Sequence, residues 1–201
     1  VKRDAHHDAD RLPIGDILRR REVKSLFVAC FFMAAAHGAL YVFYSIYLVS
    51  RGYSTTMVGF LWTLGVVAEI AIFLYLPRLL HVFSLRAILL FSFACAFVRF
   101  LMIGWGVEWL AVILLAQLLH AATFGAYHAA AVAAVSRWFA GRHQARGQAL
   151  YGSVSFGAGG MLGGLLSGWG WDGIGAELTY TLSAAFALAG MLILWRGWRL
   201  N

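Results

Sequence analysis

Three ionisable residues lie inside strongly apolar stretches, and their side chains suit proton and anion chemistry. Glu69, Arg99 and His120 each stand in a different apolar run. An ionisable side chain at the middle of a membrane costs about 2.5–3.5 kcal/mol on insertion scales, so such residues are rare and usually mark a polar pathway. A carboxyl group and an imidazole can exchange protons, and a guanidinium can hold an anion. The simpler alternative is a structural ion pair that locks two helices together.

The composition indicates that these residues belong to a membrane protein. Hydrophobic residues make up 62% of the 201 residues, charged residues make up 12%, and the mean hydropathy is +0.76. This composition excludes a water-soluble domain of this size. The net charge of +7 would suit nucleic-acid binding in a soluble protein, but membrane topology explains it here, so no nucleic-acid partner is expected.

The apolar residues fall into six runs, each near the roughly 20 residues that a membrane helix requires. We therefore expect an all-α membrane protein with a six-helix bundle over residues 25–197. Residues 1–24 are predicted to be a cytoplasmic linker and residues 198–201 a cytoplasmic tail. Because the chain begins with Val and has no apolar signal-peptide core, we expect it to be a piece of a longer protein. The predicted spans are 25–49, 55–76, 86–104, 109–135, 147–168 and 178–196.

The distribution of Lys and Arg predicts the orientation of the bundle. With Arg99 set aside as buried, fourteen of these residues lie in the segments on one side and only Arg51 on the other. The positive-inside rule then places both termini of this segment in the cytoplasm.

The first and fourth runs repeat one pattern of residues: His, Ala two positions later, an aromatic residue after four and Tyr after seven. Since the first helix would run outward and the fourth inward, the copies indicate two three-helix units of inverted orientation, a known transporter device. Spacings of four and seven also stack these side chains on one helical face, and Trp62 shares a face with Glu69 in the second run. The two copies are His37, Ala39, Tyr41 and Tyr44, and His120, Ala122, Phe124 and Tyr127.

The fifth run carries glycines at a spacing of four residues, on two neighbouring faces. Gly160, Gly164 and Gly168 form one row, and Gly159 and Gly163 form the other. Such spacing lets helix backbones approach closely, so we expect the glycines to serve packing. The alternative is a sliding surface for a rocking movement.

Several longer strings carry a family resemblance, namely His37-Gly38-Ala39-Leu40-Tyr41, Gly52-Tyr53-Ser54, Val58-Gly59-Phe60-Leu61-Trp62, Leu64-Gly65-Val66-Val67-Ala68-Glu69, Val98-Arg99-Phe100 and Leu119-His120-Ala121-Ala122-Thr123-Phe124. Together they resemble the phenylpropionate permease group of the major facilitator superfamily, over residues 26 to 195. More distantly, the chain resembles the lactose permease and other oligosaccharide:proton symporters, which carry a Glu, an Arg and a His on the helices of Glu69, Arg99 and His120. That permease has an acidic residue where this chain has Thr123.

The resemblance implies a fold of twelve helices in two halves, of which this chain would be the C-terminal six. It also implies a bacterial inner membrane protein whose partners are the lipid bilayer, the N-terminal six helices, protons and a small-molecule substrate. We expect proton-coupled import of a small organic solute, most plausibly an aromatic carboxylate such as phenylpropionate, by alternating access. An oligosaccharide or nucleoside symporter is the alternative within this class.

The site expected from these arguments has two parts. Glu69, Arg99 and His120 would couple the proton, with Glu69 taking it up and Arg99 either holding the substrate carboxylate or restraining Glu69. The residues expected to contact substrate are His37, Tyr41, Trp62, Arg99, His120, Phe124 and Tyr127.

Two readings from other classes remain. A membrane metalloenzyme could use His37, Glu69, His120 and His128. However, His120 and His128 are eight residues apart, a rise of about 12 Å along one helix, and no His-Glu-x-x-His pair occurs. We therefore expect no metal, no cofactor and no enzyme activity. The last alternative is a membrane scaffold that transports nothing.

Overall fold

The computed structural model describes residues 13–198 and contains six helical spans long and apolar enough to cross a membrane. The prediction of an all-α membrane protein with six helices is confirmed. The spans are Arg21–Ser50, Thr55–Val82, Leu85–Gly106, Leu110–Trp138, Gly141–Gly173 and Ala176–Gly197.

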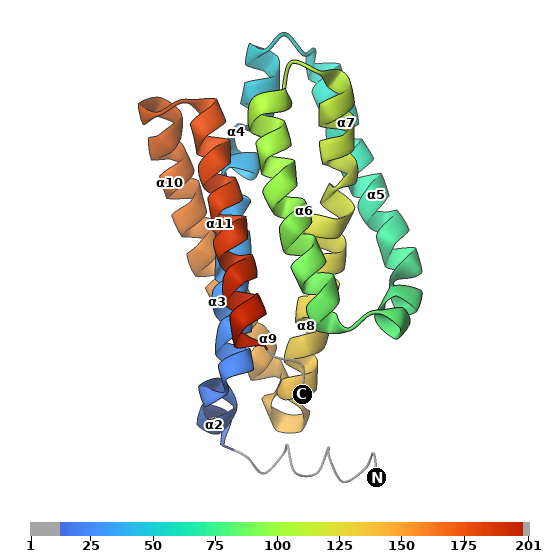
Figure 1. Cartoon of the computed structure of the whole chain (residues 1–201), viewed down its shortest axis with the longest axis vertical. Coiled ribbons are helices and arrows are strands. Elements are labelled where there is room, and N and C mark those ends of the chain that lie inside the picture. The colour runs from blue at the N-terminus through green and yellow to red at the C-terminus, as the bar shows by residue number, and fades with distance from the viewer. Residues whose placement is uncertain (1–12, 199–201) are drawn as a thin grey trace.

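Successive spans run in opposite directions and form one elongated bundle (Figure 1). Short connections join them, and both ends of the described chain lie at the same end of the bundle (Figure 1). The first and fourth spans consequently run antiparallel to each other. This is the orientation that two inverted three-helix repeats require.

The helices extend beyond the apolar runs that predicted them. The second span was expected to end near residue 76, but α5, Thr55–Val82, continues through Pro77. The fifth was expected over 147–168 and runs from Gly141 to Gly173. Hydropathy detects only the part of a helix that lipid can cover, whereas backbone hydrogen bonding continues into polar turns at the membrane surface. Proline is also tolerated within membrane helices, where neighbouring groups satisfy the freed backbone positions.

Part of the predicted linker is helical. A short helix, α2 (Ile14–Arg19), precedes the first span and buries Ile17, and the first span begins at Arg21 rather than near residue 25. The predicted linker over 1–12 and the predicted tail over 199–201 lie outside the described residues.

Three of the six spans are not one continuous α-helix. In the first, His37 separates α3 (Arg21–Ala36) from α4 (Gly38–Ser50). The fourth has a π-helical segment, η1 (Ala121–Ala126), between α7 (Leu110–Leu118) and α8 (Tyr127–Trp138). The fifth has a second such segment, η3 (Ser153–Gly159), which follows η2 (Gly141–His143) and α9 (Gln144–Gly152) and precedes α10 (Gly160–Gly173). Short π segments inside α-helices are frequent at functional sites.

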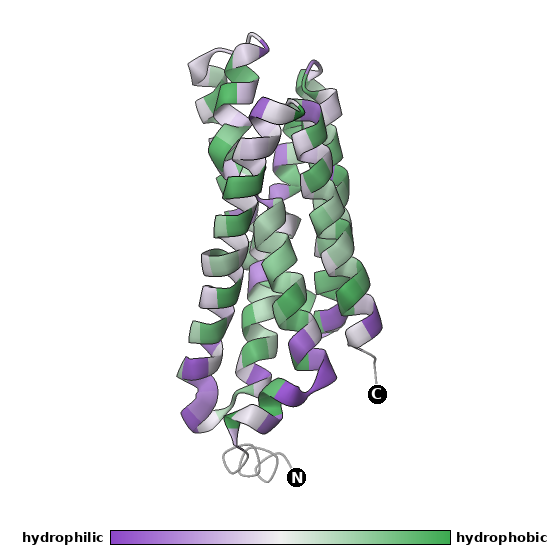
Figure 2. Ribbon diagram, turned by 90° about the vertical axis from the view of Figure 1, so that its left-hand side faces the viewer, coloured by the Kyte–Doolittle hydropathy of each residue, from purple (hydrophilic) through white to green (hydrophobic). Residues whose placement is uncertain are grey.

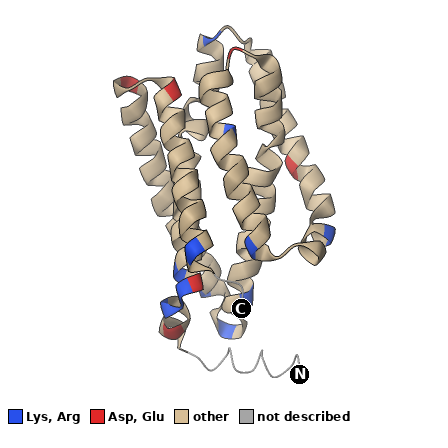
Figure 3. Ribbon diagram, in the orientation of Figure 1, with Lys and Arg blue, Asp and Glu red and all other residues tan. Residues whose placement is uncertain are grey.

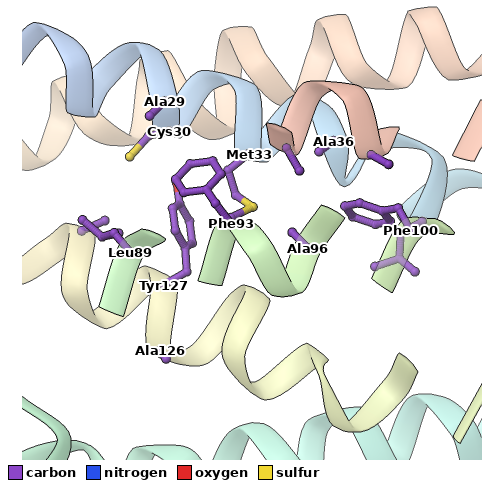
Figure 4. Close-up of a cluster of buried hydrophobic side chains, with 14 of the residues drawn as sticks. Ala29, Cys30, Met33, Ala36, Leu89, Phe93, Ala96, Phe100, Ala126 and Tyr127 are labelled. Atoms are coloured by element: carbon purple, nitrogen blue, oxygen red, sulfur yellow. The ribbon is translucent and has the colours of Figure 1, made fainter. Parts of the chain in front are cut away.

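The core lies between α3, α6 (Leu85–Gly106) and α11 (Ala176–Gly197), with the start of α8 beside them. Figure 4 shows Phe93 and Tyr127 side by side in this core, with Met33 next to them. The rings of Phe93 and Tyr127 meet edge to face at 5.9 Å between centroids. Figure 2 shows the apolar residues along the middle of the helices and the polar residues gathered near their ends, as a bilayer requires.

Only one row of glycines in the fifth span packs against a backbone. A Cβ atom at Gly163 would lie 2.3 Å from the carbonyl oxygen of Ala35, and one at Gly159 would lie 2.5 Å from that of Phe31. The other row, Gly160, Gly164 and Gly168, has nothing within 4 Å of the equivalent positions. The expected packing role therefore fits the first row, and the second row faces open space.

The two ends of the bundle differ in their charged residues. Most Lys and Arg residues lie at the end where the described chain starts and finishes, which we call the basic end (Figure 3). At the opposite end, Arg51 forms ion pairs with Glu108 and Glu177 and so joins three connections. Burial and the nearby Glu108 raise the pKa of Tyr53, so its hydroxyl stays protonated and donates to the carbonyl of Val107 at 2.8 Å.

A buried charge cluster beside an aromatic cavity

Glu69 and His120 face each other across two helices. Glu69 lies on α5, and His120 immediately precedes the π segment η1. His120 Nε2 is 3.6 Å from Glu69 Oε2, and the side chains are only 9% and 17% exposed. This distance supports an ion pair when His120 is protonated, and it is longer than a hydrogen bond.

Glycines allow the two helices to come this close. A Cβ atom at Gly125 would lie 2.6 Å from Cγ2 of Ile72 and 3.1 Å from Cγ of Glu69. At Gly65 it would sit 3.4 Å from Cδ2 of His120. The His120 ring therefore packs against Gly65 on the second span.

Arg99 is fully buried and makes its hydrogen bonds to the fourth span. Its Nε donates to the carbonyl of Ala116 at 2.8 Å, and its two terminal nitrogens donate to Gln117 Oε1 at 2.9 Å and Thr123 Oγ1 at 3.1 Å. Its exposed fraction is 0%. The guanidinium thus fastens α6 to the fourth span from inside the bundle.

Within residues 13–198, Glu69 is paired with His120 and no ion pair joins it to Arg99. On the sequence alone, Arg99 was a candidate partner of Glu69, whereas in the structure the partner is His120. Sequence reasoning noted Thr123 only as a departure from the lactose permease pattern, and it missed Gln117. A polar amide within an apolar run was the signal for Gln117. Thr123 lies in the π segment η1, where it accepts a hydrogen bond from the Arg99 guanidinium. Residue spacing alone does not reveal a π segment, so this contact could not be predicted.

A cavity of about 170 Å³ opens between the first, fourth and fifth spans. Four of the seven residues expected to contact substrate line it, namely His37, Tyr41, Phe124 and Tyr127. The remaining lining is mostly apolar or glycine and consists of Met33, Ala34, Gly38, Val42, Thr123, Phe156, Gly160 and Gly164.

The other three expected contact residues lie outside this lining. Trp62 donates from Nε1 to Ser45 Oγ at 3.0 Å and packs edge to face against Tyr44, with ring centroids 5.2 Å apart. Arg99 lies behind the fourth span, one contact away through Thr123. The His120 ring stacks on Phe124 at 5.5 Å and 16°, so it reaches the cavity through that ring.

The repeated sequence pattern corresponds to a repeated local structure. His37 stacks on Tyr41 with centroids 5.8 Å apart, as His120 stacks on Phe124 four residues later in the fourth span. In both spans the regular α-helix is interrupted at the histidine: α3 ends before His37 and α4 begins after it, and the π segment η1 starts after His120. The two histidines therefore mark equivalent places in helices that run in opposite directions.

Comparison with known proteins identifies the family of this chain. The profile of the MFS_1-like family, from the major facilitator superfamily, matches residues 5–182, which is most of the chain. The chain belongs to the MFS_1-like family. This places it among membrane transporters rather than enzymes, so the metalloenzyme alternative is not supported. No solved structure matches the chain.

One curated protein that is similar to this chain is named as a transporter. A "probable 3-phenylpropionic acid transporter" of Escherichia coli (strain K12) is 40% identical over 137 residues. The match covers 65% of this chain and 34% of the relative, so the chain spans about a third of that protein's length. The resemblance to the phenylpropionate permease group is thereby confirmed.

Proposed function

We propose that this chain is the C-terminal half of a proton-coupled symporter that imports an aromatic carboxylate such as phenylpropionate. One observation carries the proposal: a largely buried pair of ionisable groups, Glu69 and His120, adjoins a cavity lined by aromatic side chains. The ring of Phe124 links the two, because it stacks on His120 and lines the cavity. The name of the relative supplies the class of substrate.

Glu69 is the proposed proton carrier. A carboxylate in a low-dielectric site is costly to hold charged, so it readily accepts a proton when its partner cannot compensate. When Glu69 is protonated, its attraction to His120 weakens, and closing the site around substrate requires less free energy. Proton binding would in this way bias the equilibrium between outward-open and inward-open states.

Arg99 is the proposed fixed positive charge of the site. Its bonds to Ala116, Gln117 and Thr123 hold it in place, and Thr123 lines the cavity. A guanidinium at this depth raises the local electrostatic potential, which favours the approach of an anionic substrate and proton coupling through Glu69.

The remaining half of the site would come from six preceding helices. The second and fifth spans are the least buried of the six, so their free faces suit contact with an N-terminal half or with lipid. Figure 2 shows apolar surface along the helices, consistent with an integral protein, which we assign to a bacterial inner membrane. The basic end would face the cytoplasm, with both termini of this segment.

Uptake into proteoliposomes that contain the complete transporter tests this proposal. With the outside more acidic than the inside, labelled phenylpropionate should accumulate above its equilibrium level, and collapsing the pH gradient with an ionophore should abolish the accumulation. Labelled lactose is the control for the oligosaccharide alternative and should not accumulate. Lactose accumulation without phenylpropionate uptake would replace the proposal by that alternative, and uptake of neither would contradict both.

A further inference from the structure

Two residues that line the cavity, His37 and Tyr127, each have a buried polar side-chain atom with no hydrogen-bond partner among residues 13–198. His37 lines the cavity and is only 4% exposed. Its Nε2 atom has no hydrogen-bond partner among residues 13–198. Buried polar atoms are normally paired, because an unpaired one forfeits the hydrogen bonds it made to water. A bound molecule is the natural partner for a polar atom in this position.

The backbone determines which nitrogen of His37 carries the proton. His37 Nδ1 lies 2.8 Å from the carbonyl oxygen of Met33. A carbonyl oxygen only accepts hydrogen bonds, so Nδ1 must be the N–H donor. In the neutral ring, Nε2 then carries a lone pair and can only accept.

The surroundings of His37 do not favour a second proton on its ring. Its ring neighbours are the aromatic side chains of Tyr41 and Phe100, and no ion pair links it to an acidic residue within the described part of the chain. A charged imidazolium here would be buried without a counter-ion. The accepting form of Nε2 is therefore the one to which a ligand would bind.

A charged carboxylate fits this atom poorly. A carboxylate has acceptors only, so it would place its lone pairs against the lone pair of Nε2. Arg99, the nearest candidate counter-ion, does not line the cavity, and each of its three nitrogen atoms already donates to the fourth span. A group that donates a hydrogen bond satisfies Nε2 without placing a net charge among apolar side chains.

We propose that the cavity binds its substrate as a neutral hydrogen-bond donor, in practice an undissociated carboxylic acid whose O–H donates to His37 Nε2. The hydrocarbon part of the substrate would contact Met33, Phe124 and Phe156. This inference rests on the proposed function and names the form of the substrate. The substrate would take this proton from a hydronium ion on the more acidic side: the hydronium O–H bond breaks, the substrate O–H bond forms, and the proton on Glu69 is not consumed.

Two uncharged analogues separate a donor from an acceptor. In the complete, purified transporter, 3-phenylpropanamide keeps an N–H donor, whereas methyl 3-phenylpropionate has the same apolar body and only acceptors. We expect the amide to bind about tenfold more tightly than the ester, as judged from the rise in thermal unfolding temperature with ligand concentration. The affinity of the amide should not change between pH 5.5 and 7.5, while that of the acid should rise at the lower pH.

Substitution of His37 tests whether this residue causes the preference for the amide over the ester. His37→Phe keeps an aromatic ring beside Phe100 but removes the acceptor, so the amide and the ester should bind equally. His81→Phe, at an exposed position on α5, is the matched control and should keep the tenfold preference. Equal binding of both analogues to the wild type, or a preference that survives His37→Phe, would overturn the inference. Because binding is measured without a gradient, these outcomes are separate from a failure of proton-driven uptake.

Discussion

At the scale of single residues, the cost of burying charge decides which side chains meet. Glu69 and His120 share a site because each is an ionisable group that lipid would penalise, and the helices that carry them are in contact. Arg99 instead satisfies its donors with neutral oxygens of the fourth span. The charged groups of this half are thus held in two separate sets of contacts.

The role proposed for Glu69 predicts different outcomes for two substitutions in the complete transporter. Glu69→Gln mimics the protonated carboxyl group, so it should keep binding and exchange of substrate but lose accumulation driven by a pH gradient. Glu69→Ala should be worse in both respects, because it leaves His120 without its partner in a low-dielectric site. The measurement is uptake per molecule of membrane-inserted protein.

The structural ion-pair alternative predicts otherwise for the same variants. Both substitutions would lower the yield of folded protein and leave gradient-driven uptake per molecule intact. Normal accumulation by Glu69→Gln would remove Glu69 from the coupling mechanism.

A second residue-scale prediction concerns the amide that accepts from Arg99. Gln117→Leu leaves one terminal nitrogen of a fully buried guanidinium without its acceptor, which should reduce the free energy of unfolding by about 1.5–3 kcal/mol. Gln148→Leu is the control, since the partners to which Gln148 donates within residues 13–198, Val132 O and Ser136 Oγ, are neutral, and it should cost about 0.5–1.5 kcal/mol. Thermal unfolding in detergent compares them, and equal losses would show that the charge of Arg99 adds nothing.

At the scale of helices, close backbone contact depends on the face that a glycine occupies. The first span crosses the fifth where Gly38 and Gly163 meet: a Cβ atom at Gly38 would lie 2.3 Å from the carbonyl carbon of Gly163. Ala35 presses on Gly163 from the same side. The break between α3 and α4 at His37 therefore lies beside a close crossing of the first and fifth spans.

Two substitutions in the same helix test this crossing. Gly163→Ala would force α3 away from α10, and overpacking of this kind costs about 1–3 kcal/mol or more, so the yield of folded protein should fall sharply. Gly168→Ala meets nothing within 4 Å and replaces glycine by a better helix former, so its yield should be unchanged or higher. Size-exclusion chromatography of detergent extracts gives the folded fraction. A similar loss for both would mean that the glycines act through helix propensity rather than through packing.

At the scale of the whole molecule, the two ends of the bundle differ in charge and predict its orientation. The basic end carries most of the Lys and Arg residues, and the opposite end is tied by Arg51, Glu108 and Glu177 (Figure 3). Since positively charged connections remain in the cytoplasm, the opposite end should face the cell exterior.

Cysteine labelling in intact cells measures this orientation. Both native cysteines, Cys30 and Cys95, are buried, so they should give little background. Thr56→Cys, near the start of α5, should react with a membrane-impermeant maleimide added outside. Arg146→Cys, on α9, should react only after the cells are permeabilised. The reverse pattern would invert the proposed topology.

The sequence by itself determined the class of protein, the six spans, the uneven distribution of charge and the three ionisable residues inside apolar runs. These properties follow from transfer of side chains between water and lipid, which depends on composition along the chain and not on contacts. The sequence also showed that the residue pattern beginning at His37 is repeated at His120, because such a pattern is visible without a structure.

Only the tertiary structure decided which of these residues meet. The pairing of Glu69 with His120, the bonds of Arg99 to Gln117 and Thr123, and the tight packing of Gly163 depend on helix rotation and on a π turn. A helical spacing of residues defines a face, but it does not say which neighbour that face will contact, because many rotations bury the same apolar area. Packing of backbones and the satisfaction of buried donors select one of them.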